Sequence, residues 1–322
     1  MRPFHYAKPG SVAEAVRVLG ANPDAEVIAG GTDLVTLLRD GVRAPNQLVD
    51  VNGLGLDRLA WQQDGGVHIG ALCRNAVDDS RLRRAYPALV LALRSGASPQ
   101  IRNRASFGGN LLQRTRCAYF RLPEFDCNKR APGSGCAALT GDGAQTALFG
   151  ASPSCVAVHP SDCAVALVAL NAVVRVEGPS GVRRIPVEEF HVLPGDAPQR
   201  ETVLRRDEVV VAIELPPAPP SHYLKFRDRT SFAFALVSAG VAVEVSGGVV
   251  RSARIVLGGV APKPWRCGAA ERELVGGPFT EASIAKAGDA ATEGAKPRPG
   301  NEYKVELVRR VVRRALTELR NA

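Results

Sequence analysis

The feature of this sequence that most limits its fold is a long segment without hydrophobic periodicity. Residues 98–160 are rich in Gly, Pro, Ser, Cys and Arg, and they follow neither the repeat of an amphipathic helix nor the alternation of a strand. A structureless stretch of this length inside a compact chain is uncommon and is usually functional. We therefore expect regular elements on both sides of an irregular segment that carries chemistry.

Four of the seven cysteines lie in this segment, with the spacing Cys-x9-Cys-x8-Cys-x18-Cys: Cys117, Cys127, Cys136 and Cys155. The pattern is neither a Cys-x2-Cys zinc site nor a bacterial ferredoxin motif. Thiolates on an irregular loop suit a soft metal centre, because a loop can wrap a cluster. Three interpretations stay open from the residues alone: an iron–sulfur cluster, a structural zinc with His159 as an alternative ligand, or reduced thiols without metal.

The first 51 residues predict a small β-α-β unit with a parallel sheet. Ser11 has the position of a helix cap, and Gly20 fits the end of that helix. Short apolar strands are expected over 27–29 and 47–51, with a second helix beginning at Asp33 between them.

The proline-rich stretch 216–220 is the best linker candidate, and it separates a C-terminal α+β domain from the rest. Before it, we expect strands within 58–72 and near 172–176, 182–186 and 209–215, and helices within 76–97 and over 161–170. After it, we expect strands over 222–227, 236–246 and 250–260, and helices over 267–275, 280–290 and 302–320.

Two turns with paired glycines suit the binding of a dinucleotide. They are Ala29-Gly30-Gly31-Thr32-Asp33 and Ser106-Phe107-Gly108-Gly109-Asn110. Glycines let the backbone approach a ligand closely, and the N-terminus of a following helix offers free N–H groups to a pyrophosphate. Neither turn has the Rossmann or P-loop pattern. An ordinary tight turn is the alternative at each, but together they could close on one ligand from two sides.

A third candidate is Asp162, in His159-Pro160-Ser161-Asp162 just before an apolar helix. Its carboxylate could accept hydrogen bonds from ribose or ribityl hydroxyls. The alternative is a plain N-cap, which an aspartate favours in any case.

The charge and hydropathy of the chain limit the classes of partner that it is expected to bind. The net charge is +9, but only 5% of residues are aromatic and none alternate with basic residues as base-stacking sites do. We therefore expect no nucleic acid, and we assign the basic clusters to a solvated surface or an acidic partner subunit. No run of about 18 apolar residues predicts a membrane span. The N-terminus lacks a signal peptide, which favours the cytoplasm, unless a signal-bearing partner carries the chain to the periplasm.

In their order along the chain, these motifs resemble the FAD-binding medium subunit of the xanthine dehydrogenase or molybdenum hydroxylase family. The segments that carry the resemblance span essentially the whole chain: Phe4–Pro9, Ala29–Leu34, Leu48–Val51, Ile69–Ala71, Arg102-Asn103, Gly108–Leu111, Pro160–Asp162, Leu257–Ala261 and Lys263–Arg266. The run from Gly109 to Asp162, with its four cysteines, is most similar to the branch of periplasmic aldehyde oxidoreductases, whose flavin subunits carry an inserted iron–sulfur loop.

The resemblance implies an α+β protein with a two-subdomain FAD-binding fold of the vanillyl-alcohol-oxidase/PCMH type. The FAD-binding domain would cover 1–217, with subdomains over about 1–54 and 55–217, and the iron–sulfur insertion would cover about 113–158. Residues 218–322 would form the C-terminal α+β domain.

The resemblance also assigns site residues. Those expected to bind FAD are Val27, Ile28, Ala29, Gly30, Gly31, Thr32, Asp33, Leu34, Ser106, Gly109, Asn110, Asp162 and Lys225. Those expected to ligate a [4Fe–4S] cluster are Cys117, Cys127, Cys136 and Cys155. No residue of this chain is expected to act on the substrate.

The function that follows is electron transfer within a heterotrimer. A large subunit with the molybdenum cofactor would oxidise the substrate, with aldehydes as the expected class. A small subunit with [2Fe–2S] centres would pass electrons to FAD on this chain, and FAD would pass them to an external acceptor. Two alternatives belong to other classes: a stand-alone flavin oxidase, and a zinc-stabilised binding module without redox activity.

Overall fold

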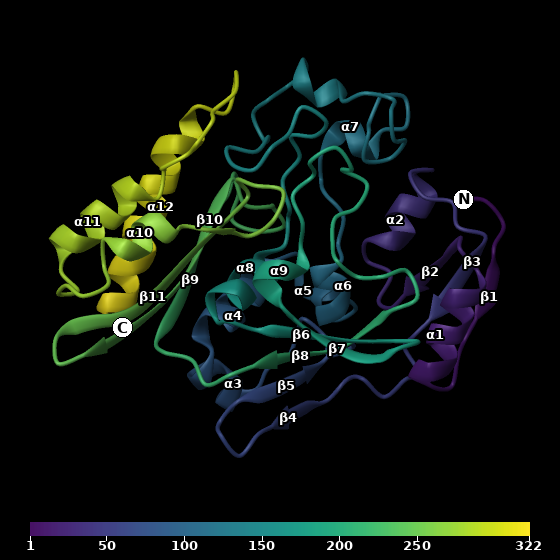
Figure 1. Cartoon of the computed structure of the whole chain (residues 1–322), viewed down its shortest axis with the longest axis horizontal. Coiled ribbons are helices and arrows are strands. Elements are labelled where there is room, and N and C mark those ends of the chain that lie inside the picture. Colours follow the sequence, from purple (N-terminus) through teal and green to yellow (C-terminus); the bar gives the residue numbers. More distant parts are fainter.

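Three β-sheets, each packed against helices, make up the structure (Figure 1). The computed structural model describes all residues from Met1 to Ala322. The sheets have three, five and four strands and follow one another along the chain. The mixed α and β content expected from the sequence is confirmed.

The N-terminal unit is a parallel sheet in the order β1-β3-β2. Its elements are β1 (His5–Ala7), α1 (Val12–Ala21), β2 (Ala25–Ile28), α2 (Leu34–Arg39) and β3 (Gln47–Asp50). Ser11 caps α1 by accepting a hydrogen bond from the Glu14 backbone N–H at 3.2 Å, as predicted. The expected stop at Gly20 is wrong: the helix continues through Ala21, and Asn22 ends it by bonding to Asn46 and Gln47 beside β3.

The central unit is an antiparallel sheet in the order β4-β5-β8-β6-β7. Its strands are β4 (Leu59–Trp61), β5 (Val67–Gly70), β6 (Val173–Gly178), β7 (Gly181–Pro186) and β8 (Val209–Leu215). The helices of this unit are α3 (Ser80–Ala85), α4 (Pro87–Ser95), α8 (Asp162–Ala169) and α9 (Val187–Phe190).

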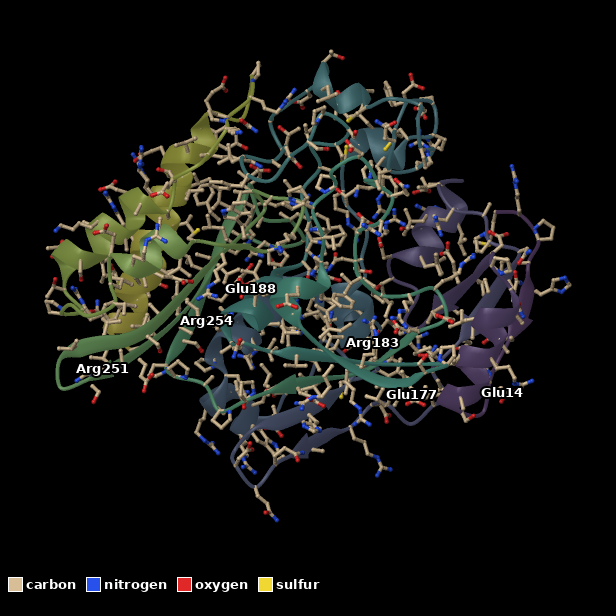
Figure 2. All side chains as sticks on the ribbon, viewed as in Figure 1. Glu14, Glu177, Arg183, Glu188, Arg251 and Arg254 are labelled. Carbon is tan, nitrogen blue, oxygen red and sulfur yellow. The ribbon has the colours of Figure 1, made fainter.

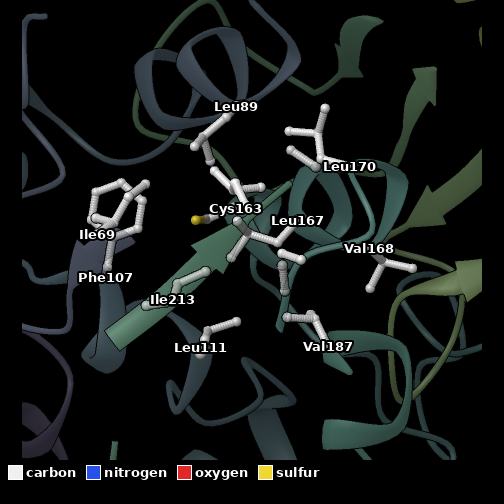
Figure 3. Close-up of a cluster of buried hydrophobic side chains, with 14 of the residues drawn as sticks. Ile69, Leu89, Phe107, Leu111, Cys163, Leu167, Val168, Leu170, Val187 and Ile213 are labelled. Atoms are coloured by element: carbon white, nitrogen blue, oxygen red, sulfur yellow. The ribbon is translucent and has the colours of Figure 1, made fainter. Parts of the chain in front are cut away.

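Helix α8 lies at the centre of the largest hydrophobic core, and all eight of its residues are buried (Figure 3). The apolar run predicted this helix, because a helix that is apolar all round must be covered on every side. Leu167 packs among residues of the central sheet and α4, and full burial of such a side chain contributes roughly 1.5–3 kcal/mol. The start of α8 therefore holds Asp162 on a rigid support.

The C-terminal unit is an antiparallel sheet in the order β12-β11-β10-β9, with helices beside it. Its elements are β9 (Ser221–Phe226), β10 (Val237–Ser246), β11 (Val249–Gly258), β12 (Trp265–Arg266), α10 (Gly268–Arg272), α11 (Glu281–Ala290) and α12 (Tyr303–Arg320). An ion pair of 2.8 Å between Arg254 on β11 and Glu188 on α9 ties this unit to the central one (Figure 2).

Helix α12 presents a buried apolar face and an exposed charged face. Four arginines on its exposed face form a basic cluster: Arg309, Arg310, Arg313 and Arg314. Each of them pairs with Asp289, Glu306 or Glu318. Three carboxylates on α11 and α12 therefore pair with the four arginines of this surface. No helix in the structure has the length and apolarity needed to cross a bilayer.

The segment 98–160 contains only short helices and turns. These helices are α5 (Pro99–Arg102), α6 (Phe107–Leu111), α7 (Ala118–Arg121) and the 3-10 turn η1 (Ala137–Leu139). The part that carries the four cysteines lies along the upper edge in Figure 1, where it contacts α2 on one side and the C-terminal unit on the other. The prediction of an irregular segment between regular elements is confirmed.

Candidate cofactor site

The first glycine turn is packed too tightly for any side chain. A Cβ atom at Gly30 would lie 1.9 Å from the backbone oxygen of Arg104, and Gly31 has a φ of 74°, which disfavours other residues. Since Arg104 stands just before the second glycine turn, the close contact at Gly30 holds the two turns against each other. The two turns are therefore neighbours in the structure, while a ligand shared between them stays a prediction.

The second glycine turn is fixed by hydrogen bonds to the end of β5. The N–H of Gly108 donates to the carbonyl of Ala71 at 2.8 Å, and that of Phe107 donates to Cys73 at 3.0 Å. The Ser106 hydroxyl accepts from the N–H of Gly109 at 3.3 Å and so caps the short helix α6. The turn is therefore rigid before any ligand arrives.

A cavity of about 420 Å³ opens between the two turns, which is within the range of small-molecule sites. It is lined by most of the residues predicted to bind a dinucleotide: Val27, Ala29, Gly30, Gly31, Thr32, Asp33, Leu34, Ser106 and Gly109. Ile28, Asn110, Asp162 and Lys225 do not line it. Asn110 instead accepts a hydrogen bond of 2.7 Å from the Ser161 hydroxyl, so it links the second turn to the start of α8.

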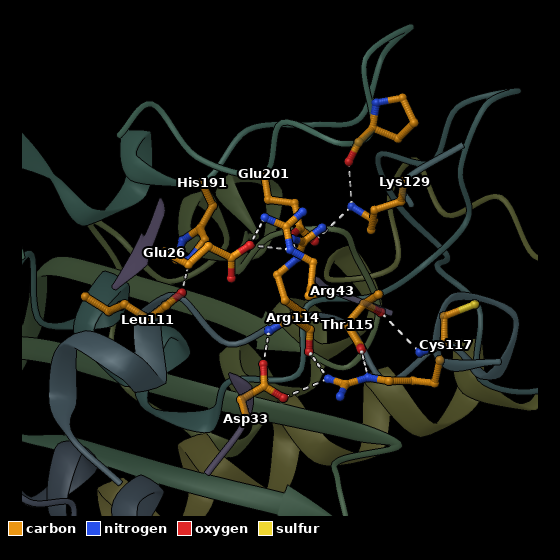
Figure 4. Close-up of polar contacts among 12 residues, drawn as sticks. Glu26, Asp33, Arg43, Leu111, Arg114, Thr115, Cys117, Lys129, His191 and Glu201 are labelled. Carbon is orange, nitrogen blue, oxygen red and sulfur yellow. Dashed lines mark hydrogen bonds and ion pairs between the residues drawn. The ribbon is translucent and has the colours of Figure 1, made fainter. Parts of the chain in front are cut away.

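The carboxylate of Asp33 is already engaged by the cysteine-bearing segment (Figure 4). It accepts a hydrogen bond from the N–H of Arg114 at 2.8 Å, and it pairs with Arg116 at 2.9 Å and with Arg121 at 2.8 Å. Through these bonds Asp33 anchors the segment to the first turn.

A second cavity of about 220 Å³ lies at the start of α8 and reaches the C-terminal unit. Asp162 is on its wall, with its carboxylate held by the Tyr223 hydroxyl at 2.6 Å and by the Lys225 ammonium at 2.8 Å. Burial, with the nearby Asp162, raises the pKa of Tyr223 well above its usual value, so the phenol remains a donor. The helix cap is Ser161 and not Asp162, which is the first helical residue.

His159 connects the two cavities, because its side chain lines both. Its ring lies 4.3 Å from that of His191, and its Nε2 atom is buried without a hydrogen-bond partner. Burial lowers the pKa of His159 far below the usual value for imidazole, so the ring is neutral at pH 7. A neutral imidazole with a free nitrogen can donate or accept one hydrogen bond toward a ligand.

The four cysteines of the irregular segment line one small cavity together. Cys127 and Cys136 are neighbours in a β-bridge, and Cys117 also lines the second cavity. Burial raises the pKa of Cys155 to about 11 even though the nearby Lys129 lowers it, so this thiol stays protonated at neutral pH unless it binds a metal. No three His, Cys, Asp or Glu side chains lie close enough to hold a single metal ion.

Family models match nearly the whole chain. A model described as the FAD-binding domain in molybdopterin dehydrogenase matches residues 2–218, and one described as the CO dehydrogenase flavoprotein C-terminal domain matches 221–319. The chain belongs to the FAD-binding subunits of the molybdenum hydroxylase family. The resemblance found in the sequence is thereby confirmed, and this flavin subunit is part of an oxidoreductase.

Relatives of this flavin subunit are similar over their full lengths. The aldehyde oxidoreductase FAD-binding subunit PaoB of Escherichia coli K12 is 44% identical over 99% of both chains. The xanthine dehydrogenase FAD-binding subunit of Escherichia coli O157:H7 is 26% identical over 97% of this chain and 94% of its own. A solved carbon monoxide dehydrogenase from Hydrogenophaga pseudoflava gives a TM-score of 0.77 at 28% identity, covering 98% of this chain and 96% of that one.

One wall of the larger cavity in this flavin subunit was missed by the sequence analysis. It comes from the loop before β8 and consists of Gln199, Glu201, Thr202, Leu204, Arg205, Arg206 and Glu208. Glu201 pairs with Arg114 and, at 2.9 Å, with Lys129, so this loop is tied to the cysteine-bearing segment (Figure 4). The loop has no motif, and its mixed charge was the only signal that could have found it.

Proposed function

We propose that this chain binds one FAD across both cavities, with the pyrophosphate at the glycine turns and the flavin ring in the second cavity. The observation that carries the proposal is the arrangement around His159, which lines a glycine-walled cavity on one side and the Asp162 cavity on the other. Membership of an FAD-binding family supports the same assignment.

Each predicted residue has a part in this proposal. The backbone from Val27 to Leu34 and the N–H groups near Ser106 and Gly109 would bind the phosphates, since that wall consists of glycines and a capped turn. Asp162, oriented by Lys225, would accept a hydrogen bond from a sugar or ribityl hydroxyl. Asn110 would hold the second turn against Ser161. Bound FAD would supply two-electron chemistry, and the protein would orient and shield it.

We further propose that the cysteine cavity holds a [4Fe–4S] cluster. In such a cluster each cysteine binds a different iron, so the four sulfurs stand farther apart than the ligands of one zinc ion, which bind at about 2.3 Å. The four cysteines that line one cavity would provide the thiolates that such a cluster needs. Lys129 and Arg130 on the same segment would offset part of its negative charge.

In the complex, we infer that a large subunit with the molybdenum cofactor oxidises an aldehyde. Electrons would reach this chain through [2Fe–2S] centres of a small subunit and would leave it for an external acceptor. The choice of aldehyde rests on the relative that is 44% identical.

The test is to purify the full chain with and without its partner subunits and to add aldehyde anaerobically. We expect the visible flavin absorbance to bleach only when the partners are present. Bleaching of the isolated chain by aldehyde would contradict the proposal, because it would make the chain a self-sufficient oxidase.

A further inference from the structure

Lys304, in the first turn of α12, is a buried cation without a carboxylate partner. The residue is 1% exposed, and its ammonium donates to the backbone carbonyls of Gly259 at 3.0 Å and Thr146 at 3.4 Å. Burial lowers its pKa to about 8, and no charged group opposes that shift. An ammonium buried without an anion is costly, so an electron-rich group beside it would relieve that cost.

The second cavity is where such a group would lie, because Lys304 is on its wall. Three further polar atoms of residues on that wall, the Ser238 hydroxyl, His159 Nε2 and Arg116 Nε, are buried without any partner. Buried polar atoms in proteins almost always have a hydrogen-bond partner, and a bound ligand would provide one here. Buried polar groups from the FAD-binding part and from the C-terminal unit therefore border one cavity.

The other charges on this wall are already compensated. Asp162 pairs with Lys225, Arg116 pairs with Asp33, and Asp142 is exposed and accepts from the N–H of Ala144 at 2.9 Å. Lys304 is thus the charge on this wall that has neither a carboxylate partner nor exposure to solvent.

We propose that Lys304 faces the flavin ring and stabilises the negative charge that the ring gains on reduction. This inference rests on the proposed function. Two electrons and one proton enter the flavin when it is reduced by the electron-carrying partner, so the ring gains one negative charge. A cation nearby in a low-dielectric cavity favours that state over the neutral oxidised ring.

The test compares the midpoint potential of bound FAD in the wild-type chain, Lys304→Met and Lys304→Arg, by equilibration with a dye of known potential. Lys304→Met should reduce the preference for reduced over oxidised FAD at least tenfold, a downward shift of about 30 mV for two electrons. Lys304→Arg keeps the charge and should stay near the wild-type potential. Lys286→Met, which removes an exposed lysine on α11, is the matched control and should leave the potential unchanged.

A potential unchanged in Lys304→Met overturns the inference, as does an equal loss of affinity for both states of FAD, which would make the lysine purely structural. If Lys304→Met does not fold, Lys304→Gln provides the same comparison. Failure of the wild-type chain to bind FAD would instead refute the proposed function, so the two failures are distinguishable.

Discussion

At Gly30, a single missing methyl group decides whether the two glycine turns can meet. The Cβ of any other residue would overlap the backbone oxygen of Arg104, which cannot move without shifting the whole second turn. The same reasoning does not apply to Gly10, where a Cβ would meet only the Glu14 carboxylate at 3.7 Å.

We predict that Gly30→Ala lowers the affinity for FAD at least tenfold, because the turns separate and the phosphate wall is lost. Quenching of flavin fluorescence on titration measures the dissociation constant. Gly10→Ala is the control and should bind like the wild type. Wild-type affinity in Gly30→Ala would show that the turns do not form the phosphate site.

Asp162 and Lys225 are a second residue-scale test, because both side chains are buried, with exposures of 8% and 2%. Loss of one partner leaves the other charge buried and unpaired. We predict that Asp162→Asn lowers the free energy of unfolding by about 3–5 kcal/mol, measured by denaturant titration.

The double variant Asp162→Asn/Lys225→Met removes both charges of this pair. It should be destabilised by less than the sum of the two single variants, because neither charge is left alone. Additive effects of the two substitutions would argue against an energetic coupling between these side chains.

At the scale of elements, the cysteine-bearing segment is bound to α2 by Asp33 and to the loop before β8 by Glu201. A small apolar cluster also joins the segment to α2 through Leu37, Phe120 and Cys127. Apart from Cys127, these supports come from residues that are not assigned to the cluster.

We predict that Cys127→Ser abolishes most of the chain's iron while the chain stays folded and retains FAD. Iron and sulfide analysis, together with circular dichroism, measures this. Cys73→Ala, which removes a buried cysteine outside the segment, should keep its iron. Equal iron contents in the two variants would contradict the assignment of the cluster to these four cysteines.

At the scale of the whole molecule, the regular elements could be predicted where hydrophobic period and caps agree. The fully apolar run after Asp162 predicts α8, and the alternating strands on either side of Ser246 predict the hairpin of β10 and β11. Local rules failed where distant residues decide. Helix α1 passes Gly20 by one residue and ends at Asn22, whose side chain bonds to Asn46 and Gln47.

In the candidate site, too, features with a local sequence pattern could be predicted and features set by distant residues could not. Glycine turns have a sequence signature, so Gly30 and Gly109 could be placed on the cavity in advance. The wall around Glu201 could not be predicted from the sequence, because only the order of strands in the central sheet brings that loop to the glycine turns. Lys304 was missed for a related reason: its helix has the pattern of an ordinary amphipathic helix, and its ammonium is covered partly by Thr146 of the distant cysteine-bearing segment.

The most direct test of the account is to purify the full chain anaerobically, reconstitute it with FAD, iron and sulfide, and measure what it retains after gel filtration. We expect about one FAD and about four iron atoms per chain, which are the contents of one flavin and one [4Fe–4S] cluster. A folded chain that retains neither would contradict the claim that the two glycine turns and the four-cysteine segment form a redox site.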